Sequence, residues 1–270
     1  MAKELIFLSH IHEEKEAALL IKSAIEDEFS GFVDVFVSSD GVSIPVGSNL
    51  LERIEKGLIN CSAAIYLISP ESIKKSWISF ELGAIWIRSK ISNQNGGKQI
   101  PALPFCYAGM TFGNLPQPIS NLHAIMATSP ADLEVAFKSL QSALGASGRI
   151  KTDLSILAEN IKRIELKITE GKSLKRLFEI IDPENQCASS LLPKLHIIPD
   201  ELIIINSTAL QNLLPELNEI ASKLKNVLSL SYGGMGMYND PINGSSTKSD
   251  VNVQIKRDAL LRHKEQIANR

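Results

Sequence analysis

The sequence predicts an α/β fold, in which a five-stranded parallel sheet lies between helices and a mostly helical region follows. Up to residue 144, short and nearly unbroken apolar segments alternate with stretches whose apolar residues recur every three to four positions. Such strands are typical of a parallel sheet buried on both faces. The Gly-containing segment 145–149 ends this alternation, and helical periodicity follows. We therefore predict one domain at 1–148 and a helical C-terminal region at 149–270.

The first half of the predicted sheet begins with a buried strand at 4–10. An amphipathic helix at 12–29 follows, and the acidic residues in its first turn suit the positive end of the helix dipole. A second strand is expected at 33–37. A polar loop with Gly and Pro at 38–49 then leads into a helix at 50–58.

The second half of the sheet adds three strands and two helices. The strands are expected at 62–69, 98–105 and 122–128. The helix that carries Glu81 lies between the first two of them. The last helix of the domain, at 129–144, has Ser129 as its expected N-cap and Pro130 at its first position.

Beyond this domain, two sets of apolar residues follow a heptad-like spacing. They are Leu154, Leu157, Ile161, Ile164 and Ile168, and then Leu210, Leu213, Leu217, Ile220, Leu224 and Val227. Two interpretations stay open because the heptads are few: helices that pack within the chain, or a coiled coil between subunits. Pro215 is expected to start or kink the second helix. A loop or disordered stretch is expected at 231–250, and a last helix at 253–270.

Composition and charge argue against several classes of protein. A net charge of −2 gives no reason to expect a nucleic-acid surface. The cysteines Cys61, Cys106 and Cys187 lie far apart, which fits free thiols in a reducing compartment. No apolar run suits a signal peptide or a membrane span, and no cluster has metal-ligand spacing. We expect a cytoplasmic protein without a metal, a membrane contact or a direct nucleic-acid contact.

The segment SWISFELGAIW, at 76–86, carries a single acid, Glu81, on an otherwise apolar helix. The residues three and four positions from Glu81 are Trp77, Ile78, Ala84 and Ile85. None of them is basic, so the helix offers the carboxylate no salt-bridge partner. Three predicted strand ends, with the sequences SHIH, SSD and SPES, gather polar residues at the edge where such sheets bind ligands.

Four motifs follow one another along the first half of the chain: LIFLSH, VDVFVSSDGVSIPVG, AIYLISP and the W-x-x-x-E pattern of Trp77 and Glu81. Their order and spacing over about residues 3–144 resemble a Toll/interleukin-1 receptor (TIR) domain, in particular the bacterial and plant branch that cleaves NAD. The resemblance implies a flavodoxin-like sheet with a C-terminal extension. It also implies that Glu81 is catalytic and that the substrate lies between its helix, the first strand end and the loop after the second strand, the BB loop of the family.

One carboxylate is enough for the chemistry that this resemblance implies. Ordinary glycoside hydrolysis needs a second carboxyl group to protonate the leaving oxygen. Nicotinamide leaves NAD as a neutral molecule and needs no proton, so Glu81 could stabilise the oxocarbenium-like ribose, most strongly in a desolvated site. Desolvation would also raise the pKa of Glu81. NAD+ is then the substrate, and no cofactor is expected.

We predict different roles for the two tryptophans near Glu81. Trp77 lies one turn before Glu81 and could stack on the nicotinamide or the ribose. Its alternative role is that of a core residue under the sheet. Trp86 is expected in the core.

Four further residues are candidates for substrate binding. Ser9 and His10 resemble family positions that line the nucleotide site. His12 either binds substrate or lies in solvent in the first turn of its helix. Animal members that cleave NAD tend to have arginines where this chain has Ile11 and His12, which leaves open how the phosphates are neutralised. Asp40 either contacts the ribose or only shapes an Asp-Gly turn.

The resemblance implies an NAD+ glycohydrolase that releases nicotinamide and either ADP-ribose or a cyclic isomer, in bacterial anti-phage defence. It also implies a homo-oligomer formed through TIR–TIR contacts, a possible partner protein of the defence system, and an assembly or sensing role for the C-terminal region. Two alternatives stay open: a TIR interaction scaffold without catalysis, and an enzyme that resembles nucleoside deoxyribosyltransferases.

Overall fold

The computed structural model of the chain describes residues 3–37, 50–240 and 244–269. It divides into two compact units, Met1–Leu166 and Lys167–Arg270, each with its own sheet and hydrophobic core. The division falls within helix α5 (Leu154–Ile181). The boundary predicted after residue 148 stays a prediction. Within the described ranges, no helix is both long and apolar enough to cross a membrane.

The first unit is built on five parallel strands. They are β1 (Glu4–Ser9), β2 (Val33–Val37), β3 (Ala63–Ile68), β4 (Ala102–Cys106) and β5 (Ile125–Met126). Their order in the sheet is β2-β1-β3-β4-β5, which is the flavodoxin-like arrangement. The predicted fold class is therefore confirmed. In this arrangement, ligands bind beyond the carboxyl ends of β1 and β3, where the direction of the crossovers reverses.

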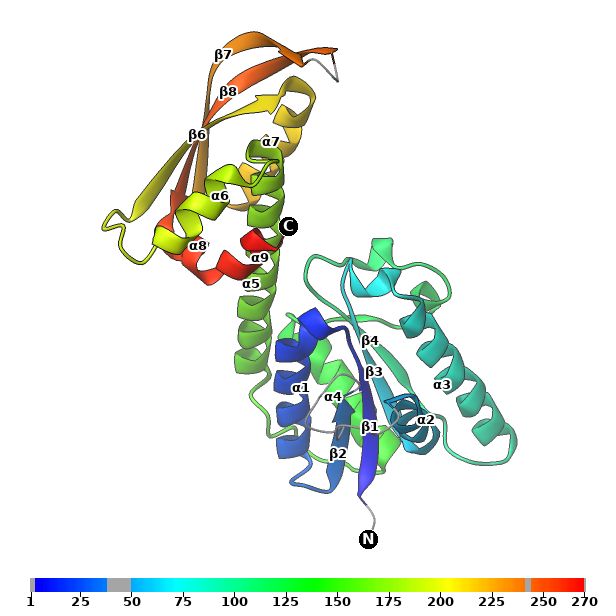
Figure 1. The fold of residues 1–270 in the computed structure, drawn as a ribbon. Coiled ribbons are helices and arrows are strands. Elements are labelled where there is room, and N and C mark those ends of the chain that lie inside the picture. Colours follow the sequence, from blue (N-terminus) through cyan, green and yellow to red (C-terminus); the bar gives the residue numbers. More distant parts are fainter. Residues whose placement is uncertain (1–2, 38–49, 241–243, 270) are drawn as a thin grey trace. The chain divides into compact units, whose positions relative to one another are not determined.

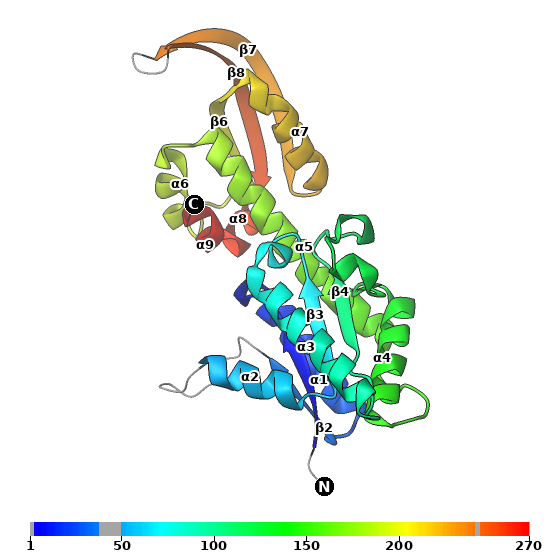
Figure 2. The same ribbon diagram turned by 90° about the vertical axis from the view of Figure 1, so that its right-hand side faces the viewer.

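Four helices cover the two faces of this sheet (Figures 1 and 2). Helices α2 (Leu50–Asn60) and α3 (Ser76–Gln94) share one hydrophobic core with the side chains of Phe7 and Tyr66. Helices α1 (Lys15–Glu28) and α4 (Pro130–Leu144) lie on the opposite face. Short 3-10 helices complete the unit: η1 (His12–Glu14), η2 (Ser72–Lys74), η3 (Phe112–Asn114) and η4 (Ile119–Asn121).

The ends of α4 are determined by local sequence. The Ser129 hydroxyl accepts a hydrogen bond from the backbone N–H of Asp132 at 3.3 Å, and Pro130 occupies the first turn. Gly145 ends the helix in the left-handed conformation, with φ of 69°. The predicted N-cap is therefore confirmed.

The second unit contains a three-stranded antiparallel sheet in the order β6-β8-β7. The strands are β6 (Leu202–Leu210), β7 (Leu228–Asp240) and β8 (Gly244–Lys256). The helices are the last part of α5, α6 (Gln186–Leu191), η5 (Leu192–Lys194), η6 (Gln211–Leu213), α7 (Leu214–Lys223), α8 (Arg257–Arg262) and α9 (Lys264–Ala268). They share one core with the inner face of the sheet, and the region remains mostly helical.

The prediction of a loop or disordered stretch at 231–250 was wrong, because its described residues belong to β7 and β8. One face of an antiparallel sheet meets solvent, so alternate positions carry polar residues that obscure the strand pattern. The predicted helix at 253–270 begins only at Arg257, since Val253 and Ile255 are inward-facing residues of β8.

Most of the heptad-like residues are buried inside the chain. Leu210 lies outside the predicted helix, because it ends strand β6 and its side chain is exposed. Leu157, Ile161 and Ile164 are buried on α5, and Leu217 and Ile220 are buried on α7. Pro215 lies in the first turn of α7, as predicted. This burial favours packing within the chain over a coiled coil between subunits.

Candidate active site

Glu81 is completely buried on the face of α3 that packs against the sheet. Ile78, Leu82 and Ile85 surround it on the same helix face and enter the hydrophobic core. A carboxylate in such a place loses its hydration, so its free energy depends strongly on the few polar groups that reach it.

Ser9 is the last residue of β1, and its hydroxyl donates a hydrogen bond to Oε2 of Glu81. Ser9 faces the α3 side of the sheet because it lies two residues after Phe7, which packs in the same core. The structure therefore brings two of the predicted site residues together at the carboxyl end of β1.

Tyr66 is a site residue that the sequence analysis missed. It lies next to Ser9 in the parallel register of β1 and β3, and its side chain is buried. Its hydroxyl has no hydrogen-bond partner among the residues that the structure describes. Burial and the nearby Glu81 and Cys61 raise the pKa of Tyr66, so the phenol stays neutral and can donate a hydrogen bond. A tyrosine inside the otherwise apolar strand AAIYLI was the signal available in the sequence.

Burial raises the pKa of Glu81 to about 7. The hydrogen-bond donors of Ser9 and Trp77 oppose this rise, although no hydrogen bond of ordinary geometry joins Trp77 to the carboxyl group. The second oxygen, Oε1, has no hydrogen-bond partner in the described part of the chain. Glu81 is thus a carboxyl group with a pKa of about 7 and one buried oxygen that accepts no hydrogen bond from the described residues.

Trp77 is 38 % exposed and stacks on Phe80, with ring centroids 5.2 Å apart and an interplanar angle of 28°. This exposure argues against a core role for Trp77. The prediction that Trp86 lies in the core was wrong, since Trp86 is 58 % exposed. The sheet can cover only one side of α3, whereas the apolar residues of this helix surround its whole circumference.

The other predicted residues lie in different surroundings. His10 is buried directly after β1, whereas His12 is exposed at the start of η1. Asp40 lies outside the described residues. The binding roles of all three stay predictions.

Glu14 is a second buried carboxyl group, which the sequence analysis did not single out. Its Oε1 accepts a hydrogen bond from the Ser69 hydroxyl at 2.6 Å, and its Oε2 accepts one from the backbone N–H of Ile11 at 3.0 Å. Burial raises the pKa of Glu14. Glu14 thereby links the turn after β1 to the segment that follows β3.

A family model described as TIR domain matches residues 6–140, which is half of the chain. The chain belongs to the TIR domain family. A relative of this TIR protein is the 2′ cyclic ADP-D-ribose synthase BtTIR of Bacteroides thetaiotaomicron. The two are 30 % identical over 96 residues, which are 35 % of this chain and 30 % of the relative. The match therefore spans less than a third of the length of that curated protein.

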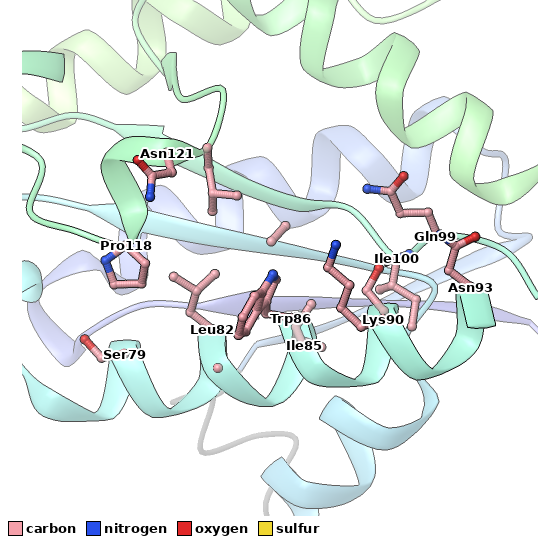
Figure 3. A pocket seen from close by; sticks show the side chains of 14 residues that line it. Ser79, Leu82, Ile85, Trp86, Lys90, Asn93, Gln99, Ile100, Pro118 and Asn121 are labelled. Carbon is pink, nitrogen blue, oxygen red and sulfur yellow. Dashed lines mark hydrogen bonds between the residues drawn. The ribbon is translucent and has the colours of Figure 1, made fainter. Parts of the chain in front are cut away.

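The TIR domain also has a cavity of about 450 Å³ that α3 lines in part. Figure 3 shows Leu82, Trp86 and Lys90 along this helix, with Pro118 and Asn121 from the segment around η4. Ser9, Trp77 and Glu81 are not among the residues that line it. The cavity is thus distinct from the buried carboxyl group, although one helix contributes to both.

Proposed function

We propose that this protein is an NAD+ nucleosidase that breaks the bond between nicotinamide and ribose, with Glu81 as the catalytic residue. The observation that carries the proposal is the state of Glu81: complete burial, one hydroxyl donor from Ser9, and an oxygen without a partner among the described residues. A buried carboxylate of this kind can stabilise a positive charge much more strongly than one in water.

The proposed reaction uses the ionised form of Glu81. The C–N bond breaks with its electron pair going to the pyridinium nitrogen, so nicotinamide leaves neutral and needs no general acid. The carboxylate stabilises the oxocarbenium-like ribose that remains. Water then adds to give ADP-ribose and releases a proton to solvent. Alternatively, a nucleophile within the same molecule adds, with loss of its proton where it is a hydroxyl, to give an isomer of cyclic ADP-ribose. The BtTIR relative is a 2′ cyclic ADP-D-ribose synthase, which supports this chemistry.

The neighbouring residues have proposed supporting roles. The exposed Trp77 ring, stacked on Phe80, offers a face to a cationic pyridinium. Ser9 orients Glu81 through its hydroxyl group, and the neutral Tyr66 phenol beside it is a further hydrogen-bond donor in the site. His10, His12 and Asp40 remain proposed contacts to the nucleotide. NAD+ enters as substrate, so the reaction needs no resident cofactor.

The wider role that we propose is bacterial anti-phage defence, by depletion of NAD+ or by synthesis of a signalling nucleotide. TIR–TIR contacts between copies of the chain, and a partner protein of the defence system, would control the activity. A non-catalytic scaffold is the main alternative. It is disfavoured because a buried carboxyl group destabilises the fold and would serve no purpose there.

The decisive experiment measures nicotinamide release from NAD+ by the wild type and by Glu81→Gln. Glu55→Gln is the matched control, since Glu55 is an exposed acid on α2. We expect Glu81→Gln to lose activity by roughly 100-fold or more and Glu55→Gln to match the wild type. Low and high protein concentrations test the dependence on assembly. Equal activity in all three proteins would contradict the proposal, and transfer of deoxyribose between bases would favour a deoxyribosyltransferase instead.

A further inference from the structure

Strand β6 forms one edge of the sheet in the second unit, and it contains no charged residue. Figure 1 shows this sheet with the long β7–β8 hairpin beside β6. Within the described residues, β6 pairs with β8 on one side, and no backbone group outside the sheet bonds to its main chain. Exposed edge strands normally carry lysine, proline or a bulge that prevents pairing with another chain. The nine residues of β6 have none of these features.

The outer face of β6 is also unusually apolar for a strand that meets solvent. Ile204 is 59 % exposed, and Leu202 and Leu210 at the two strand ends are exposed as well. The residues that β8 places opposite them are Lys256, Gln254 and Lys248. At these three positions the edge strand β6 carries apolar side chains, whereas the central strand β8 carries polar or charged ones.

We propose that β6 pairs with β6 of a second copy of this chain, antiparallel and about a twofold axis at Asn206. Asn206 is the middle residue of the strand. This register places Leu202 opposite Leu210 of the second copy and Asn206 opposite itself, and no charged residues face each other. A twofold interface of this kind is self-complementary, and the pairing would join two three-stranded sheets into one of six strands. The inference goes beyond the proposed function and does not depend on NAD+ cleavage.

A cysteine at the proposed twofold axis tests the register directly in the full-length chain. Asn206→Cys should form a disulfide-linked dimer on mild oxidation, because residues that face each other across antiparallel strands lie within reach of a disulfide. Asn252→Cys is the matched control. Asn252 lies on the same sheet face, donates a hydrogen bond to Asn206 at 2.6 Å, and belongs to the central strand. Similar amounts of covalent dimer in the two variants would overturn the proposal.

A second pair of variants tests the pairing without oxidation. Ile204→Lys adds a charge at the edge, whereas Gln254→Lys adds the same charge at the facing position of β8. Light scattering over a concentration series should show at least a tenfold weaker dimer for Ile204→Lys and no change for Gln254→Lys. Circular dichroism checks that both variants are folded. A wild type that has the same mass as Ile204→Lys at every concentration would also overturn the proposal.

Discussion

Glu81 and its hydrogen-bond donor Ser9 form the centre of the candidate site. The helix gives Glu81 no basic neighbour, and the strand end supplies one hydroxyl donor instead. One donor only partly offsets the loss of hydration, so the pKa remains near 7. The carboxyl group can therefore gain or lose a proton within the neutral range.

The raised pKa of Glu81 predicts how stability depends on pH. Its ordinary value is 4.5 and its value in the folded protein is about 7. Between these values the folded state binds more protons than the unfolded state, so the free energy of unfolding falls as the pH rises and levels off above 7. We expect the wild type to lose up to about 3 kcal/mol relative to Glu81→Gln over this interval.

Urea denaturation of both proteins at several pH values from 4.5 to 8 measures this difference. The comparison with Glu81→Gln cancels the contribution of Glu14, because the pKa of Glu14 is raised by its own burial and not by Glu81. Parallel pH profiles for the wild type and the variant would show that the burial of Glu81 has no such effect.

The turn between β1 and α1 depends on Glu14. Glu14→Ala leaves the Ser69 hydroxyl and the Ile11 N–H without their acceptor. We expect a loss of about 2 kcal/mol in the free energy of unfolding. Glu13→Ala is the control, because Glu13 is the exposed neighbour of Glu14. Its replacement should change the free energy of unfolding by no more than about 0.5 kcal/mol. Equal unfolding midpoints in urea would contradict this structural role.

Helix α3 allows a comparison between two isoleucines that are two residues apart. Ile85 is completely buried, whereas Ile87 is about half exposed. Ile85→Ala should destabilise the protein by about 2 to 4 kcal/mol and Ile87→Ala by less than about 1 kcal/mol. Thermal unfolding followed by circular dichroism measures both. A similar loss for the two variants would mean that the apolar outer face of α3 is covered in solution.

Most elements of the first unit could be predicted from sequence, because a strand buried on both faces needs an unbroken apolar segment. The segment 33–37 became β2 with the same bounds. The second unit was harder to predict, since its strands alternate inward valines with outward polar residues, as Val251, Asn252 and Val253 do. Glu81 was found from its isolation on the helix. Tyr66 was not found, because only the register of β1 and β3 places it beside Ser9. Glu14 was not found either, because its hydrogen bond to Ser69 joins two turns that are distant in the sequence.

Over the whole molecule, the two sheets have separate hydrophobic cores. We therefore expect two thermal transitions in scanning calorimetry. Val253→Ala removes a buried side chain of β8 and should lower one transition while leaving the other unchanged. A single transition that shifts as a whole would show that the two units unfold together.

The chain contains two tryptophans, Trp77 and Trp86, and both lie on α3 with partly exposed rings. Its indole fluorescence therefore originates from one helix of the TIR domain. Added quenchers or a bound nicotinamide ring would change this emission, whereas unfolding confined to the second unit would not. Fluorescence and calorimetry should consequently give different denaturation curves for the same sample. The difference between the curves would measure the unfolding of the second unit, which contains no tryptophan.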